Sequence, residues 1–129
     1  MSPTTEEDDM TSEIRRTFYP LIATADPDTS MEWLEKAFGF VPHNVYRDDS
    51  GKIVHAEMGY DTGLFMFGAG VRVKAAVYVA VDDPDAHHDR AKAAGAEIFR
   101  ELADTDYGSR DYAARDLDGN EWYFGTYRP

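Results

Sequence analysis

The stretch Asp26-Pro27-Asp28 decides the fold, because it returns 57 residues later as Asp83-Pro84-Asp85. A second pair of matching residues lies at the same spacing, since Phe67-Gly68 recurs as Phe124-Gly125. Self-similarity at a fixed spacing is typical of duplicated supersecondary units. The sequence therefore predicts that one structural unit has been used twice in the chain.

The first unit reads as a strand, a helix and three further strands. Phe18–Thr24 is short, apolar and bounded by an Asp-Pro pair, which predicts a strand. Asp26 is a candidate N-cap for a helix whose first residue is Pro27, and Gly39 is a candidate left-handed cap at its end. Three strands should follow, separated by turn-forming Asp and Gly residues, and we place them near residues 43–47, 53–58 and 64–67.

The second unit repeats this order, which gives βαβββ twice. It opens with a predicted strand at Ala75–Val81, and its helix begins at Asp83-Pro84 and ends near Gly95. Three strands are expected near residues 97–102, 110–115 and 121–127. Residues 70–74 are too few for a flexible linker between domains. Module one (14–70) and module two (71–129) should therefore share a single domain.

Length and composition bound the possible functions. A chain of 129 residues that is 43% hydrophobic has enough apolar material for one core. It contains no cysteine, which excludes disulfides and thiolate metal sites. No apolar run approaches the roughly 20 residues of a membrane span, and no signal-peptide pattern is present. These features predict a cytoplasmic protein that does not contact the membrane.

The charge balance is strongly acidic, with a formal net charge of −12. This argues against nucleic acid as a partner, because its phosphates require a basic surface. Part of the charge lies in residues 1–13, which contain five acidic residues and neither Lys nor Arg, and which we expect to form a disordered tail. The negative charge of the rest of the chain could attract a cationic ligand, or it could simply keep the protein soluble.

One long segment resembles a known family. Tyr107-Gly108-Ser109-Arg110-Asp111-Tyr112-Ala113-Ala114-Arg115-Asp116-Leu117-Asp118-Gly119-Asn120 is similar to a segment of bleomycin-resistance-type proteins, which belong to the glyoxalase/bleomycin-resistance family of the vicinal oxygen chelate superfamily. Leu117 stands where proline is usual in that pattern. The resemblance extends from about Arg15 to the end of the chain. It implies an α+β fold in which paired βαβββ modules form a curved mixed sheet, shaped as a cup.

The resemblance also implies where a metal would bind. In metal-dependent members, two His and two Glu or similar residues point inward from the first and last strand of each module. The corresponding positions in this chain are Tyr19, Met66, Ala76 and Tyr123. Alanine and methionine offer no oxygen or nitrogen, and tyrosine would have to lose a proton whose pKa is near 10. We therefore predict that the protein has no metal and no other cofactor in the cup.

Strand alternation predicts what lines the cup instead. Besides the residues at the metal positions, the same faces should carry Leu21, Tyr78 and Ala80, while Tyr107 reaches in from a loop and Tyr112 completes the set. The opposite faces are bulky and apolar, which favours a core role for Trp122 over a role as a ligand platform. The predicted ligand-binding residues are Tyr19, Met66, Tyr78, Tyr107, Tyr112 and Tyr123. They suit an aromatic or planar ligand held by stacking, or they simply fill the cup.

Histidines supply the remaining candidates. His55 and Glu57 lie two apart on a predicted strand, so they share a face and could form an acid/base or metal pair, or an ordinary surface pair. His87 and His88 are flanked by acidic residues in the second predicted helix and read as part of a solvated face.

Three functions remain open from the sequence. The first is a metal-free protein that binds a small planar or cationic molecule, similar to proteins that give antibiotic resistance by sequestering a drug. The second is an enzyme of the same superfamily, a lyase, isomerase or dioxygenase, with an atypical site around His55, Glu57 and Tyr123. The third is a ligand-sensing or partner-binding module. The resemblance further implies a homodimer, because in this family the second half of each cup is often supplied by the partner chain.

Overall fold

The computed structural model describes residues 16–68 and 71–129, so the expectations for the acidic tail at residues 1–13 lie outside the described residues. The first module contains one helix, α2 (Pro27–Phe38), followed by strands β1 (Val41–Arg47), β2 (Ile53–Tyr60) and β3 (Gly63–Gly68). The second module contains β4 (Ala76–Ala80), α3 (Pro84–Ala93), β5 (Glu97–Asp104), β6 (Arg110–Arg115) and β7 (Glu121–Gly125). Neither helix has the length and apolar character needed to cross a membrane.

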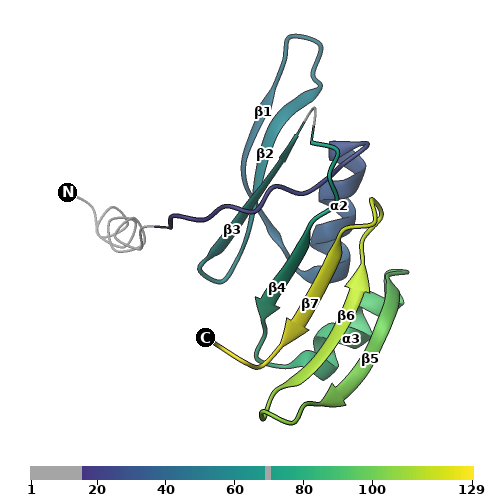
Figure 1. Ribbon diagram of the computed structural model, residues 1–129. Helices are drawn as coiled ribbons and strands as arrows, with labels where there is room; N and C mark the ends of the chain where they lie inside the picture. Colours follow the sequence, from purple (N-terminus) through teal and green to yellow (C-terminus); the bar gives the residue numbers. More distant parts are fainter. Residues whose placement is uncertain (1–15, 69–70) are drawn as a thin grey trace, which may run out of the picture.

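The strands form two sheets, and both helices cover the same side of them (Figure 1). The first sheet has the order β1-β2-β3 and the second has the order β4-β7-β6-β5. The β4–β7 pair is parallel, and every other pair of named strands is antiparallel. This mixed α+β architecture is the one expected from the repeated βαβββ pattern.

The predicted strand at Phe18–Thr24 is wrong in its extent. Only one isolated parallel bridge forms there, between Leu21 and Met66. The reason is that the segment lacks a backbone N–H donor that a longer ladder with β3 would need. The bridge is made by the Ile22 N–H, which donates to the Met66 carbonyl at 3.1 Å, and by the Met66 N–H, which donates to the Pro20 carbonyl at 2.9 Å, but Pro20 has no N–H with which to extend the ladder.

The isolated bridge in the first module corresponds to a strand pair in the second module. Leu21 pairs with Met66 in the first module, and Tyr78 pairs with Tyr123 in the second, both in parallel register. Adding the 57-residue spacing to the first pair gives the second pair. The duplication read from the sequence is therefore a duplication of strand register, and the first strand of module one is its degenerate copy.

The duplicated Asp-Pro motifs start the two helices as predicted. The side chain of Asp26 accepts a hydrogen bond from the backbone N–H of Thr29, and that of Asp83 accepts one from the N–H of Ala86. Each cap satisfies an N–H group that the helix itself leaves without a partner. Helix α2 then ends at Gly39, whose φ of 75° is the left-handed conformation that glycine adopts at little cost.

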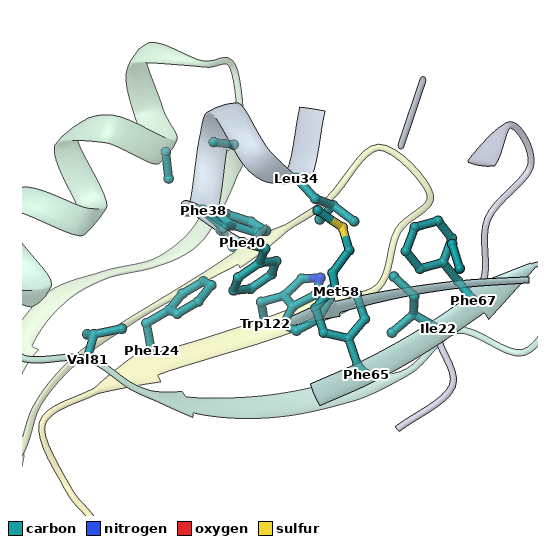
Figure 2. Packing of buried hydrophobic residues seen from close by; sticks show 14 of the residues in the cluster. Ile22, Leu34, Phe38, Phe40, Met58, Phe65, Phe67, Val81, Trp122 and Phe124 are labelled. Atoms are coloured by element: carbon teal, nitrogen blue, oxygen red, sulfur yellow. The ribbon is translucent and has the colours of Figure 1, made fainter. Parts of the chain in front are cut away.

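A single aromatic core joins the two modules, as Figure 2 shows. Phe38 and Phe40, which lie at and just beyond the end of α2, pack on Trp122 of β7 with ring centroids 6.0 and 4.9 Å away. Phe65 of β3 lies 5.0 Å from the same indole. Trp122 is completely buried, so its predicted core role is confirmed. The opposite strand parity thus faces the helices, as strand alternation predicted.

Asn120 connects three segments beneath this core. Its fully buried side chain accepts hydrogen bonds from the backbone N–H groups of Ala23 and Ala75, at 3.0 and 2.9 Å, and donates to the carbonyl of Ala23 at 2.8 Å. It also donates to the carboxylate of Asp116, 2.9 Å away, which accepts a further bond from the Trp122 indole N–H. Burial raises the pKa of Asp116, and these donors oppose the shift.

The prediction that His87 and His88 form a solvated face is wrong, because both side chains are buried. His87 Nδ1 lies 2.5 Å from the Tyr112 hydroxyl, and its Nε2 lies 2.8 Å from the carbonyl oxygen of Phe38. The acidic neighbours in sequence suggested exposure. However, two adjacent residues of a helix can both lie on the face that packs on the core, and the two histidines occupy that face of α3.

Candidate functional site

The second sheet carries a cluster of aromatic side chains on the face turned away from the helices. Tyr78 of β4 and Tyr123 of β7 are direct neighbours across the parallel ladder. The ring of Phe99 stands edge-on to Tyr123 with centroids 5.6 Å apart. Two guanidinium groups cover these rings: Arg100 lies 5.5 Å from the Tyr123 centroid and Arg115 lies 4.2 Å from the Phe99 centroid. We call these five residues the tyrosine face.

The hydroxyl of Tyr123 is fixed by an acidic neighbour. It donates a hydrogen bond to Glu121, with the two oxygens 3.0 Å apart. This bond to a carboxylate is the main cause of a raised pKa for Tyr123. The phenol therefore stays protonated at neutral pH and acts as a hydrogen-bond donor, not as an anionic ligand.

Tyr107 lies at one end of the tyrosine face, next to Tyr78. Its hydroxyl donates to Asp111 at 3.2 Å, and its ring stands edge-on to Tyr127 with centroids 5.8 Å apart. Tyr78 donates to the Tyr127 carbonyl at 2.7 Å, and burial raises the pKa of Tyr78. A Cβ at Gly125 would lie 2.0 Å from Asp111 and 2.8 Å from the Tyr78 hydroxyl, so glycine is required for this cluster to close.

The first sheet carries a polar group on its corresponding outward face. His55 Nε2 lies 2.9 Å from Glu57 Oε2, and the amide of Asn44 donates to the other oxygen of Glu57 at 3.0 Å. The bond from His55, followed by that from Asn44, lowers the pKa of Glu57, so this carboxyl is ionised at neutral pH. Met66 pairs with Glu57 across the β2–β3 ladder. The predicted shared face of His55 and Glu57 is thus present.

The remaining predicted residues differ in position. Tyr19 belongs to the extended segment before α2, and its hydroxyl donates to the Arg16 carbonyl at 3.2 Å. The prediction that Tyr112 lines the cup is wrong, because this side chain is completely buried beneath α3. In the β6–β7 register Tyr112 lies opposite Phe124, a core residue, and not opposite Tyr123. Strand parity, applied to β6 as well, would have placed it correctly.

The predicted ligand residues therefore lie on two sheets and remain open. Met66 belongs to the first sheet, whereas Tyr78 and Tyr123 belong to the second. Tyr19 and Tyr78 are each 39% exposed and Tyr107 is 65% exposed. Small-molecule sites usually bury 70–90% or more of their ligand. In this chain the predicted ligand residues therefore form open surfaces and do not enclose a ligand.

Two clefts were not predicted from the sequence. One, of about 370 Å³, opens between the modules above Phe65 and Trp122, and includes Tyr78 on its wall. The other, of about 450 Å³, lies where the chain enters α2. Each is lined by segments that are far apart in the sequence, so no local pattern announces it.

The side chains at the family's metal positions do not fit a divalent cation. Ala76 and Met66 have no oxygen or nitrogen donor, and the Tyr123 phenol is held protonated by Glu121. Across residues 16–68 and 71–129, moreover, no group of three or more His, Cys, Asp or Glu side chains is arranged to hold a metal ion.

Comparison with known proteins agrees with this architecture. Residues 16–124 match the family described as the Glyoxalase/Bleomycin resistance protein/Dioxygenase superfamily. The crystal structure of TioX from Micromonospora sp. ML1 is 34% identical, with a TM-score of 0.73 over 85% of this chain and 94% of TioX. A glyoxalase-related enzyme from Clostridium phytofermentans is 22% identical, with a TM-score of 0.71 over 87% of this chain and 95% of that protein. Comparison with curated proteins gives no significant match.

A glyoxalase-like fold of two βαβββ-type modules defines the class of this protein. The family match spans most of the chain, and TioX exceeds 30% identity over nearly its whole length. The chain belongs to the Glyoxalase/Bleomycin resistance protein/Dioxygenase superfamily.

Proposed function

We propose that the protein binds a small planar molecule on the tyrosine face without a metal ion, and sequesters it in the manner of bleomycin-resistance-type proteins. The observation that carries this proposal is the direct pairing of Tyr78 with Tyr123, extended by the ring of Phe99. Aromatic rings offer stacking area, and the tyrosine hydroxyls offer oriented hydrogen bonds.

A positive charge on the ligand fits the same face. Aromatic rings attract cations, and Arg100 already takes such a position over Tyr123. A cationic ligand would replace this guanidinium. The net charge of −12, with Glu121 and Asp111 close to the tyrosines, would favour its approach.

A homodimer would complete the site. Placing the first sheet of one protomer over the tyrosine face of its partner would bring His55, Glu57 and Met66 opposite Tyr123. A two-fold axis then produces two equivalent cups. Static light scattering at micromolar concentration should therefore report two chains per particle, and a monomer there would exclude a two-chain cup.

Substitutions on the tyrosine face should weaken binding. With bleomycin as the probe, Tyr123→Ala and Tyr107→Ala are each expected to raise the Kd about tenfold, because a lost aromatic contact costs roughly 1–1.5 kcal/mol. Titration followed by quenching of intrinsic fluorescence measures this. Tyr123→Phe is the matched control that keeps the ring and removes only the hydroxyl, so its Kd should change much less. Unchanged affinity in both alanine variants would move the site to His55 and Glu57.

The metal content provides a separate check. After dialysis, elemental analysis of the purified protein should find much less than one zinc, nickel, iron or manganese per chain, because the four family positions lack suitable donors. One tightly held ion per chain would contradict metal-free binding.

An enzymatic function is favoured by one specific contact. The 2.9 Å bond between His55 and the ionised Glu57 would orient the imidazole, with Nε2 donating and Nδ1 free to accept a proton. This is the arrangement of a general base supported by a carboxylate. A superfamily lyase, isomerase or dioxygenase of this kind should turn over a molecule that co-purifies with it, and His55→Gln should abolish turnover while leaving binding intact.

A further inference from the structure

A basic cleft lies where the chain enters α2, outside the tyrosine face. Its volume is about 450 Å³, within the range of small-molecule sites. The residues that line it are Ala23, Thr24, Ala25, Pro27, Lys52, Ile53, Val71, Arg72, Lys74 and Asp118. None of them belongs to the tyrosine face or to the polar group on the first sheet.

Three of the lining side chains are cations that form no ion pair with the described residues, although Lys52 is close enough to Asp48 to help lower the pKa of that carboxyl. Lys52, Arg72 and Lys74 are exposed, and none makes an ion pair or side-chain hydrogen bond with the described residues. Arg110 and Arg115, by contrast, are each paired with two carboxylates. On a chain with a net charge of −12, three cations around one cleft form an unusual local excess of positive charge.

The acidic residue of the cleft, Asp118, keeps its negative charge but forms no ion pair with these three cations among the described residues. Asp118 accepts from the backbone N–H of Ala25 at 2.7 Å with one oxygen, and from the hydroxyl of Ser30 at 2.5 Å with the other. Its two oxygens are therefore used to hold the entry to α2. Thr24, also in the wall, has a buried hydroxyl oxygen without a hydrogen-bond partner among the described residues.

The walls of the cleft are held in place from below. Asn120 binds the backbone of Ala23 on one side and that of Ala75, next to Lys74, on the other. The stem of Lys74 crosses the β6–β7 turn at Gly119, where a Cβ would lie 3.0 Å from the lysine Nζ. Glycine there lets the lysine lie close to the turn. The backbone at Ala23 and Ala75 is thus held by hydrogen bonds, which reduces the entropic cost of ordering the cleft on binding.

We propose that the basic cleft is a second ligand site, which binds a small organic oxyanion bearing a phosphate group or clustered carboxylates. Lysine and arginine are the usual partners of such groups. The net negative charge of the chain disfavours binding of an anion in general, whereas the local excess of cations favours it at this cleft. The site would act alongside the tyrosine face, and it does not depend on the function proposed for that face.

The test uses the full chain with inorganic pyrophosphate and citrate as probes, in metal-free buffer at low ionic strength. Isothermal titration should give one binding event per chain for at least one probe, weakened by added salt. The double variant Lys52→Gln/Lys74→Gln should raise the Kd at least tenfold. The matched control is Lys36→Gln/Lys92→Gln, which removes the same charge from two exposed helix positions and should leave the Kd within twofold.

Several outcomes would overturn the proposal. Failure of both probes to bind either the full chain or the chain without residues 1–13, or equal weakening by the cleft and control variants, would mean that no site exists beyond general electrostatics. A chain without residues 1–13 provides a further arm, because those residues contain Glu6, Glu7, Asp8 and Asp9. The same Kd as for the full chain is expected. Binding by the shortened chain alone would show that the acidic residues compete for the cleft, and that a free anion is not its ligand.

Discussion

Replacing Asn120 by alanine is expected to lower the free energy of unfolding by about 3–5 kcal/mol, among the largest effects of any single polar substitution in this chain. The side chain is completely buried and bonds to the N–H and carbonyl of Ala23 and to the N–H of Ala75. Its loss would leave two buried backbone groups of Ala23 and one partly buried group of Ala75 without partners, at a cost of roughly 1–3 kcal/mol for each buried group. It would also remove a donor from the buried carboxylate of Asp116.

Urea unfolding at pH 7 measures this loss. Asn44→Ala is the control, since Asn44 is exposed and its substitution should change the free energy of unfolding by no more than about 0.5 kcal/mol. A loss below about 1 kcal/mol for Asn120→Ala would mean that water replaces the amide, and that the connection between the modules does not depend on it.

The elements of this fold were predictable because their signals are local. Asp-Pro pairs set the helix starts, Gly39 set the end of α2, and β6 was placed at residues 110–115 as observed. The role of Asn120 could not be read in this way. In sequence it is only the last residue of a turn, and its partners lie 97 and 45 residues away. Long-range polar contacts of this kind leave no periodic pattern.

The repeat explains which parts of the site could be anticipated. Core positions keep their character between the copies: Phe65 corresponds to Trp122 and Phe67 to Phe124, and all four are buried. Outward positions change instead, since Leu21 and Met66 correspond to Tyr78 and Tyr123.

The asymmetry between the two outward faces follows from these changes. The common core held both copies in the same register, while the outward residues were free to diverge into a polar face on the first sheet and an aromatic face on the second. Strand alternation located both faces, but it could not show that they lie on separate sheets and are open to solvent in this chain.

The buried pair of His87 and Tyr112 was missed for a related reason. Ser30 occupies the position in the first helix that corresponds to His87, so the repeat gave no warning of a large polar side chain there. Both residues are buried. Acidic residues lie two positions away on both sides of His87, at Asp85 and Asp89, and only the packing of α3 on β6 shows that the ring faces inward.

His87 should make the stability of the protein depend on pH. Its imidazole is held neutral, with Nε2 donating to the Phe38 carbonyl and Nδ1 accepting from the Tyr112 hydroxyl, and it lies 4.3 Å from the Phe124 ring centroid. Burial is the main cause of a lowered pKa for His87, and the charge of Arg90 acts in the same direction. The pKa of Tyr112 is raised by burial, so this hydroxyl remains a donor throughout the range considered.

The sign follows from which state binds the proton. Because the pKa of His87 is lower in the folded protein than the ordinary value near 6.5, the unfolded chain takes up a proton first as the pH falls. The stability that His87 contributes is complete above about pH 6.5 and is lost as the pH falls towards its folded-state pKa. The loss by pH 5 is at most about 2 kcal/mol, the limit reached when only the unfolded state is protonated.

His87→Gln isolates this effect. At pH 8 the free energy of unfolding of the variant should be about 2–3 kcal/mol lower than that of the wild type. Glutamine cannot bond to both the Tyr112 hydroxyl and the Phe38 carbonyl in the same geometry. Urea unfolding at intervals from pH 8 to pH 5 should then show the two proteins converging, since only the wild type carries this histidine. His43→Gln, at a side chain that is 51% exposed, should keep the wild-type dependence on pH. Parallel profiles for wild type and His87→Gln would mean that His87 titrates alike in both states and that its burial has no protonation cost.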